Sequence, residues 1–342
     1  MTKHGLWLSA SIVALAWNGT ACAQAAPETA KSERQARAEA SAGVPSPEVV
    51  ITARRRSENL MRTPIAATVL TGTDLTNRGV NNVDALQFAA PSITVNNFGQ
   101  GNDFNIRGIG KAEHNTQTTT GVITYRDGAP TFPGYFQGEP YYDIANIQVL
   151  RGPQGTIVGQ NATGGAVFVN SNDPKIDGGV HGYAQAHYGN YNELGGEFAV
   201  NIPISSTLAA RVAVYGQRRD SFYHITGPGG APYTHKKGYQ RLAAGRFSFL
   251  WKPTSQLTVL WKTDLDYLNF GAYPADPYTD RFRTLPGSTT PNPNYRDLFN
   301  ITANSPMGAR DKFWRSILRG EYQLDSGIRL RSVSALSKGE TF

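Results

Sequence analysis

"QLTVLWKTDLDYL", residues 256–268, alternates apolar and polar side chains over a dozen positions. In an extended chain one face of this segment is apolar, and its residues are Leu257, Val259, Trp261, Leu265 and Tyr267. The opposite face carries Lys262, Asp264 and Asp266. A period of two predicts a β-strand, and this strand is longer than the ~5–6 residues that are usual in soluble proteins.

The same alternation recurs in "RLAAGRFSFLWK" (241–252) and "KFWRSILRGEYQL" (312–324). Strands of ~10 residues or more, with one apolar face and aromatic residues towards their ends, are typical of transmembrane β-barrels. Short turns such as 324–327, alternating with long connections such as 271–310, fit the same architecture. A soluble β-sandwich, which uses this alternation in shorter strands, is the alternative.

Seven strands of this kind are predicted after Pro174. They lie near residues 179–189, 193–203, 207–222, 239–252, 256–270, 311–324 and 327–338. Bacterial barrels of this class have an even number of strands. We therefore expect residues 173–342 to be the N-terminal portion of a transmembrane β-barrel in a truncated chain.

The first 23 residues have the pattern of a secretory signal peptide. Lys3 and His4 precede an apolar run from Gly5 to Trp17, and the small residues around Cys22 suit a cleavage site after Ala23. A lipid attachment signal centred on Cys22 is the alternative. Residues 24–47 are rich in Ala, Glu, Arg, Ser and Pro and hold almost no large apolar residue, so a disordered linker is predicted.

A short β-branched run, "EVVITA" at residues 48–53, follows this linker. No partner strand is adjacent to it in the sequence. A strand-forming segment on a tether is suited to pairing with the edge of another protein's sheet. The alternative, equally favoured by the local sequence, is an edge strand of the next domain.

Residues 54–172 are predicted to form a small α+β domain. Asn82 can cap a helix that ends at Pro91 and whose apolar face would hold Val83, Leu86 and Phe88. Short strands are predicted near 93–95, 104–106, 122–125, 147–150 and 166–169, with a turn at Asp127-Gly128. The glycines between residues 152 and 165 permit left-handed turns and close approach of backbones.

No pattern of catalytic or metal-binding residues emerges from the sequence. The six histidines are widely spaced, no phosphate-binding loop motif occurs, and Gly108-x-Gly110 lacks a third glycine. We therefore expect neither an enzyme nor a resident cofactor or metal. The net charge of +7 comes from dispersed basic residues, with only Arg54 to Arg56 in a run, and a nucleic-acid partner is not expected.

Three segments together resemble the TonB-dependent receptors of the Gram-negative outer membrane: "FNIRGIG" (104–110), "TYRDGAP" (124–130) and "IQVLRGPQGTIVGQNATGGAVFV" (147–169). They are similar to that family's plug motifs, and "EVVITA" is similar to its TonB box. Gln160, where many members have Arg, and Arg126, in a strand that is usually more apolar, are departures from the family pattern.

The resemblance implies an α+β plug domain inside an antiparallel transmembrane β-barrel of roughly 22 strands, which seven strands cannot close. It implies that TonB binds residues Glu48, Val49, Val50, Ile51, Thr52 and Ala53. The plug motif would comprise Arg107, Gly108, Gly110, Asp127, Gly128, Arg151, Gly152, Gly155, Gly159, Asn161, Gly164 and Gly165. Further implied partners are ExbB and ExbD, acting through TonB, outer-membrane lipid and a small-molecule cargo.

The function implied is active import across the outer membrane, with a ferric siderophore as the leading cargo. Haem, for which His114 is the one plug candidate, cobalamin or an oligosaccharide are alternatives by the same mechanism. A passive porin or an adhesin is a second class of function, which would need neither a plug nor a TonB box.

Overall fold

The computed structural model describes residues 50–51, 58–59, 65–97, 102–111, 118–132, 138–154, 158–227, 231–233, 239–271, 284, 289–291, 299–302 and 308–341. The chain divides into two units, Met1–Glu48 and Val49–Phe342. The predicted signal peptide and linker lie outside the described residues. Everything below concerns the second unit.

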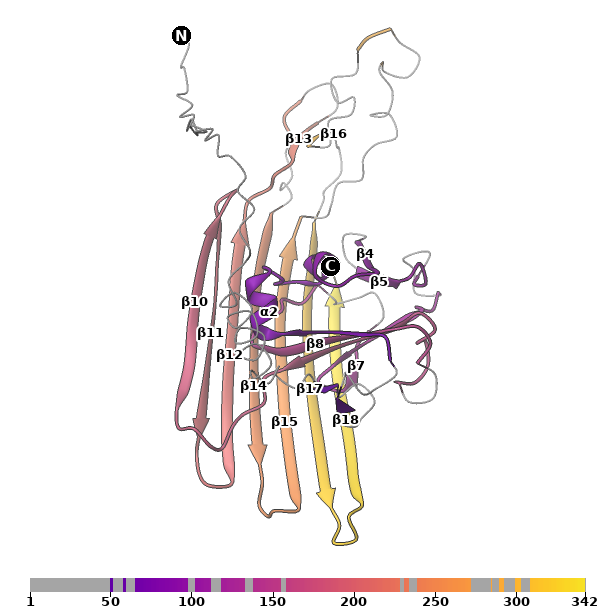
Figure 1. The fold of residues 1–342 in the computed structure, drawn as a ribbon. Coiled ribbons are helices and arrows are strands. Elements are labelled where there is room, and N and C mark those ends of the chain that lie inside the picture. Colours follow the sequence, from indigo (N-terminus) through magenta and orange to yellow (C-terminus); the bar gives the residue numbers. More distant parts are fainter. Residues whose placement is uncertain are drawn as a thin grey trace, which may run out of the picture. The chain divides into compact units, whose positions relative to one another are not determined.

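Seven long antiparallel strands form one sheet, called the long sheet below (Figure 1). In order across the sheet they are β10 (His181–Gly189), β11 (Glu193–Pro203), β12 (Leu208–Arg219), β14 (Gln240–Trp251), β15 (Leu257–Phe270), β17 (Ala309–Gln323) and β18 (Arg329–Thr341). All seven predicted strands are present, with ends that differ from the prediction by three residues or fewer. In the described residues β10 and β18 are the two edges, so the sheet is open.

The two faces of the long sheet differ as the alternation predicts. Phe249 on β14 and Trp261 on β15 pair across the strands on the apolar face, where their stacked rings lie 5.6 Å apart. Lys262 and Asp264 point to the opposite face and are each 1% exposed. An aromatic outer face and a charged inner face match the pattern of a sheet that meets lipid on one side.

The connections between the long strands are alternately short and long. In the β17–β18 turn Leu324 N donates to Ile328 O at 2.8 Å, and Gly327 has a φ of 82°. The two long connections are joined to each other, because β13 (His224–Thr226) pairs in parallel with β16 (Asn300–Thr302). The second of these strands lies inside the segment 271–310 that was predicted as a loop.

A smaller mixed domain precedes the long sheet. Its five-stranded sheet has the order β3 (Ala67–Thr71), β8 (Ile144–Arg151), β9 (Gly165–Ser171), β6 (Val122–Arg126) and β7 (Ala129–Pro130). A separate pair is formed by β4 (Ile93–Asn97) and β5 (Asn102–Ile106), and the helices are α2 (Gly72–Asn77) and α3 (Val83–Ala89). The five strands predicted in this domain are present, whereas β3, α2 and β7 were not predicted.

Helix α3 begins as predicted, because the Asn82 side chain accepts a hydrogen bond from Ala85 N at 2.8 Å. The predicted apolar face is wrong at one residue: Phe88 is 87% exposed, while Val83, Leu86 and Ala89 are buried. These three buried residues are spaced by three, which places them on one side of a helix. Phe88 lies two positions after Leu86 and therefore points away from the core.

The core of the mixed domain lies between its helices and its sheet. Leu86 of α3, Ile147 of β8 and Val167 of β9 are completely buried in it.

None of the helices that the structure describes is long and apolar enough to cross a membrane.

Candidate functional site

The inner face of the long sheet presents four buried basic side chains, one from each of four neighbouring strands. Arg211 comes from β12, Arg246 from β14, Lys262 from β15 and Arg315 from β17. Each is at most 7% exposed. Buried charges require partners, and the mixed domain supplies a carboxylate to Arg211, Lys262 and Arg315.

The acidic partners lie in the turns and loops of the mixed domain. Asp127 is the first residue of the two-residue turn between β6 and β7, where Asp127 and Gly128 have φ values of 49° and 90°. This is the backbone of a type I′ hairpin turn, and it confirms the turn predicted there. Glu139 and Asp143 precede β8, and Asp143 also has a positive φ of 49°.

Asp143 and Arg211 form a two-pronged ion pair. Arg211 Nε lies 2.7 Å from Asp143 Oδ2, and Arg211 Nη2 lies 2.5 Å from Oδ1. Asn172 Nδ2 also donates to Oδ1 at 2.8 Å. A planar guanidinium matches a carboxylate in this geometry, so the contact fixes orientation as well as distance.

Lys262 is held by a cluster of oxygen atoms. Its Nζ lies 2.9 Å from Asp127 Oδ1, 2.7 Å from Asp173 Oδ1 and 2.7 Å from Ser171 Oγ. Ser171 in turn donates to Asp127, through its backbone N at 3.0 Å and its Oγ at 2.8 Å. All charges and donors in this cluster are therefore used.

A chain of alternating charges crosses from the mixed domain to the long sheet. Arg126 pairs with Glu139, and Glu139 Oε2 accepts from Arg315 Nη2 at 2.6 Å. Asp264 then lies between Arg315, 3.4 Å from its Nε, and Arg246, 2.6 Å from its Nε. Arg126 was noted as a departure within a strand, and its buried pairing gives that residue a structural role.

Tyr142 provides the main aromatic contact between the two parts. Its side chain is 1% exposed and packs against Ala199, Ala213 and Ala244 of the long sheet. The Arg246 guanidinium lies 4.7 Å from the centre of its ring. Burial raises the pKa of the Tyr142 hydroxyl well above its ordinary value, so this ring remains uncharged. Small residues on the sheet thus leave room for one large ring from the mixed domain.

The comparisons with known proteins fit this arrangement. The family model described as "TonB-dependent Receptor Plug Domain" matches residues 59–166. Residues 59–166 are therefore a plug domain of the TonB-dependent receptor type. The mixed domain is accordingly the plug, and the ion pairs above join the plug to the long sheet.

Two curated relatives illustrate the similarity. The iron-regulated outer membrane virulence protein of Vibrio cholerae is 30% identical over 182 residues, which cover 49% of this chain and 27% of that protein. The pesticin receptor of Yersinia pestis is 26% identical over 162 residues, covering 47% and 23% respectively. The chain spans about a quarter of the length of these relatives.

Two solved structures share the fold. The ferric-catecholate import receptor Fiu of Escherichia coli K12 in its closed form has a TM-score of 0.67 at 18% identity, over 86% of this chain and 39% of that one. The ferric yersiniabactin uptake receptor FyuA of Yersinia pestis has a TM-score of 0.65 at 21% identity, over 81% and 41%. The predicted fold class, a plug domain followed by antiparallel barrel strands, is confirmed.

Most of the predicted plug-motif residues shape the backbone of the plug. Arg107 and Gly108 have φ values of 54° and 79° and form a second two-residue turn, closed by Ile109 N donating to Ile106 O at 3.0 Å. A Cβ on Gly110 would lie 2.7 Å from the backbone O of Phe104 and would overlap the Asn105 side chain, so a larger residue there would displace both. Among the described members of the predicted set, Asp127 makes an ion pair with the long sheet, through Lys262.

The Gly-rich segment after β8 contains further left-handed positions. Gly152, Gly159 and Asn161 have φ values of 92°, 107° and 62°. The Arg151 side chain donates to Ala67 O at 3.3 Å and thereby joins β8 to β3. Gly155 lies outside the described residues. Gln160 is exposed, and nothing in the structure explains its difference from the family pattern.

Only part of the predicted TonB box is described. β1 (Val50–Ile51) pairs with β2 (Glu58–Asn59), whereas Glu48, Val49, Thr52 and Ala53 lie outside the described residues. The expectation that this run has no partner strand nearby in the sequence is wrong, because β2 follows within seven residues of Ile51.

Sequence analysis missed the residues that join plug and sheet, among them Glu139, Asp143, Arg211 and Arg315. The sequence signal that could have identified Arg211 and Arg315 is a charged residue on the inner face of a strand whose outer face is apolar. Lys262 and Asp264 show this signal. In the described part of the chain, no three His, Cys, Asp or Glu side chains are grouped so that they could hold a metal ion.

The contacts that Asp127 and Asp173 make with Lys262 are expected to be independent of pH between about 5 and 8. Burial alone would raise the pKa of Asp127, but Lys262, Arg246 and Ser171 hold it below the ordinary value of 3.8. The pKa of Asp173 is also lowered. A carboxylate with a lowered pKa stabilises the folded state above its ordinary pKa, and this stabilisation is lost as the pH falls through the lowered value.

Thermal unfolding of the purified protein at pH 8, 6, 5 and 3 checks this expectation. The difference in midpoint between the unaltered protein and Asp127→Asn should stay level down to about pH 5 and shrink below about pH 4. A difference that changes mainly between pH 5 and 7 would contradict the assignment of Asp127.

Proposed function

We propose that this protein imports a ferric siderophore across the outer membrane, with energy delivered through TonB. The observation that carries the proposal is the plug joined to the charged inner face of the long sheet by buried ion pairs. Separating buried charges from their partners costs several kcal/mol for each pair. A plug held in this way would have to be moved by work supplied from elsewhere, which distinguishes an active importer from a passive pore.

The N-terminal segment is the proposed site at which that work enters. β1 holds the centre of the predicted TonB box and is paired only through two residues of β2 in the described chain. Because this pairing spans only two residues, a competing strand would readily displace β2 from β1. TonB would then bind residues 48–53 by strand addition, in which main-chain hydrogen bonds provide the grip.

The cargo is proposed from the relatives. Their printed names describe an iron-regulated outer membrane protein, a catecholate siderophore receptor and a ferric yersiniabactin uptake receptor. These names support an iron–siderophore complex and export of this protein to the outer membrane. The passive porin or adhesin has no comparable support.

Uptake assays test the proposal directly. A strain that lacks its own iron receptors would express the full-length protein and receive radiolabelled iron as a ferric trihydroxamate, a ferric tris-catecholate, a ferric phenolate–thiazoline complex or haem. We expect accumulation of at least one siderophore complex, abolished by a protonophore. Accumulation that persists without a proton gradient would contradict energised import.

Val50→Pro is expected to reduce uptake to the level seen with a protonophore while leaving cargo binding at the cell surface unchanged. Proline has no backbone N–H and therefore removes a donor from any strand formed by residues 48–53. Binding of labelled cargo to intact cells and its accumulation over time would be measured separately.

Val50→Ala is the matched control, because it shortens the same side chain and keeps the backbone donor. It should transport at a rate close to that of the unaltered protein. Uptake at the normal rate in Val50→Pro would overturn the assignment of the TonB-binding segment.

A further inference from the structure

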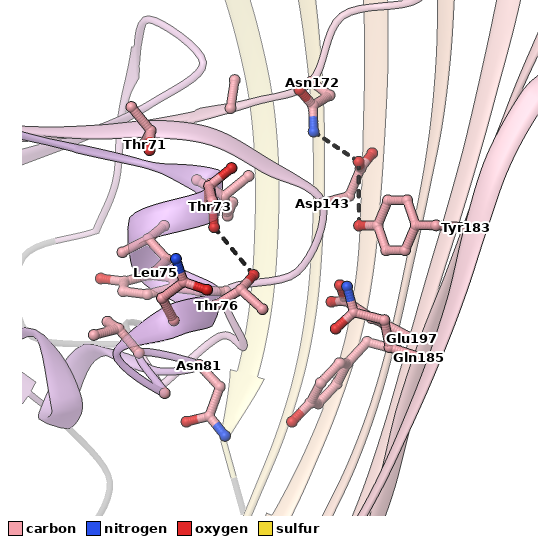
Figure 2. A pocket seen from close by; sticks show the side chains of 18 of the residues that line it. Thr71, Thr73, Leu75, Thr76, Asn81, Asp143, Asn172, Tyr183, Gln185 and Glu197 are labelled. Carbon is pink, nitrogen blue, oxygen red and sulfur yellow. Dashed lines mark hydrogen bonds between the residues drawn. The ribbon is translucent and has the colours of Figure 1, made fainter.

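A cavity of about 720 Å³ lies between helix α2 of the plug and strands β10–β12 of the long sheet (Figure 2). Its volume is in the range of small-molecule binding sites. Its lining is polar and apolar in about equal parts, and it includes Thr73 and Thr76 on the plug side and Gln185, Glu197 and Tyr215 on the sheet side. None of the described residues that line it belongs to the ion pairs that Lys262 and Arg315 make with the plug.

The sheet side of the cavity is fixed by strand register. Gln185 of β10 pairs with Glu197 of β11, and Glu197 pairs with Tyr215 of β12, so the three side chains form one row on the inner face. The Tyr215 hydroxyl donates to Gln217 Oε1 at 2.6 Å. An amide, a carboxylate and an aromatic ring thus stand side by side on rigid strands, which is where a precise binding site is best supported.

The plug side is fixed by the start of α2. Thr71 and Asp74 form a capping box, in which Thr71 N donates to Asp74 Oδ2 at 2.9 Å and Asp74 N donates to Thr71 Oγ1 at 3.2 Å. Figure 2 shows Asn81 and Gln185 lining the cavity from opposite sides. Neither of these two amide side chains hydrogen-bonds to another described residue, so both are available to a ligand.

The charge of the cavity is negative. Asp143 reaches its lining but is neutralised by Arg211. The Tyr183 hydroxyl donates to Asp143 Oδ1 at 3.5 Å. Glu197 is a second carboxylate of the lining, and no Lys or Arg is among the described lining residues. The one basic group there is His187, whose Nε2 lies 3.4 Å from Glu193 Oε1. The negative charge of Glu197 is therefore not neutralised by a Lys or Arg of the described lining, and it would attract a cationic ligand.

We propose that this cavity is an interior binding site for an uncharged or positively charged ligand rich in hydroxyl and amide groups. The role of this cavity in import rests on the proposed function. In that role the cavity would hold cargo, between plug and sheet, after the cargo has left an outer site. The Asn81 and Gln185 amides suit a neutral complex such as a ferric trihydroxamate, whereas Glu197 disfavours a trianionic ferric tris-catecholate.

The charge of the cavity can be measured without knowing the cargo. In a full-length protein whose mature chain has no other cysteine, Gln185→Cys would be reacted with a cationic trimethylammonium methanethiosulfonate and with an anionic sulfonate analogue. Each rate is divided by that of a free thiol in the same buffer. We expect the corrected cation-to-anion ratio to be about fivefold or more, the effect of one charge a few ångströms away in a wet cavity.

Glu197→Gln should bring this ratio close to one. Ala184→Cys, the neighbouring position on the opposite face of β10, is the matched control, and its ratio should not respond to Glu197→Gln. Raising the salt concentration from about 0.01 to 1 M should also lower the ratio at Gln185→Cys, because salt screens exposed charges. This second measurement needs no change at Glu197. A ratio near one at low salt would overturn the proposal.

The role in import is tested on the same variant in cells. Modification of Gln185→Cys with the cationic reagent should leave surface binding intact and lower uptake of a ferric trihydroxamate by about tenfold, whereas modified Ala184→Cys should transport normally. Full uptake after modification would overturn the role of the cavity in import. If the unmodified protein shows no energised uptake of any complex, the proposed function fails, while the rate ratios still decide whether the cavity is a negatively charged site.

Discussion

Asp143→Ala is expected to lower the free energy of unfolding of the plug–sheet contact by about 3–5 kcal/mol, the cost of leaving one partner of a buried ion pair alone. Arg211 would remain buried with both of its carboxylate contacts gone. The Asn172 amide would lose its acceptor as well. Denaturant unfolding of the purified protein in detergent, followed by protease sensitivity of the plug, measures the effect.

Two comparisons give this prediction its controls. Asp173→Ala removes a carboxylate whose side chain is 43% exposed, and it should cost about 1 kcal/mol or less, as exposed ion pairs do. Lys262 would keep Asp127 and Ser171 in that variant. Combining Asp143→Ala with Arg211→Leu should recover much of the loss, because no unpaired charge remains buried. Equal costs for Asp143→Ala and Asp173→Ala would show that the Asp143–Arg211 pair does not hold the plug.

The sequence could predict which way the strand residues face, but it could not predict their partners. A period of two places Lys262 and Asp264 on the inner face because side chains alternate along a strand. This period carries no information on which residues Lys262 and Asp264 contact. Arg211 and Asp143 are 68 residues apart, and Arg315 and Glu139 are 176 residues apart. Such pairings depend on where the plug rests, which no local pattern encodes.

Helix α2 shows a second reason for incomplete prediction. Its sequence "GTDLTN" is short and lacks strong helix formers other than Leu75, so propensity argues against a helix. The Thr71–Asp74 capping box was the available signal, and packing of Leu75, which is 4% exposed, supplies the rest. Tertiary contacts therefore override propensity in the element that borders the proposed interior site.

Gly165→Ala is expected to lower the free energy of unfolding of the plug by about 3 kcal/mol or more, the sum of backbone strain and overpacking. Gly165 begins β9 with a φ of 147°, and it pairs with Val122 on one side and Arg151 on the other. A Cβ there would lie 2.2 Å from Leu150 O and 2.9 Å from Ile106 Cδ1. The carbonyl belongs to β8 and cannot move without breaking the β8–β9 pairing. Denaturant unfolding with a probe on the plug measures the change.

Gly79→Ala separates the two contributions. Gly79 also has a positive φ, of 65°, but a Cβ there would meet nothing within 4 Å. That variant should cost only about 1–2 kcal/mol, the penalty of left-handed backbone for a residue with a side chain. Because both variants include such a penalty, the excess in Gly165→Ala reports the close approach of β8 to β9. Equal losses would mean that Gly165 is needed only for its backbone angle and that the plug sheet tolerates a methyl group at the start of β9.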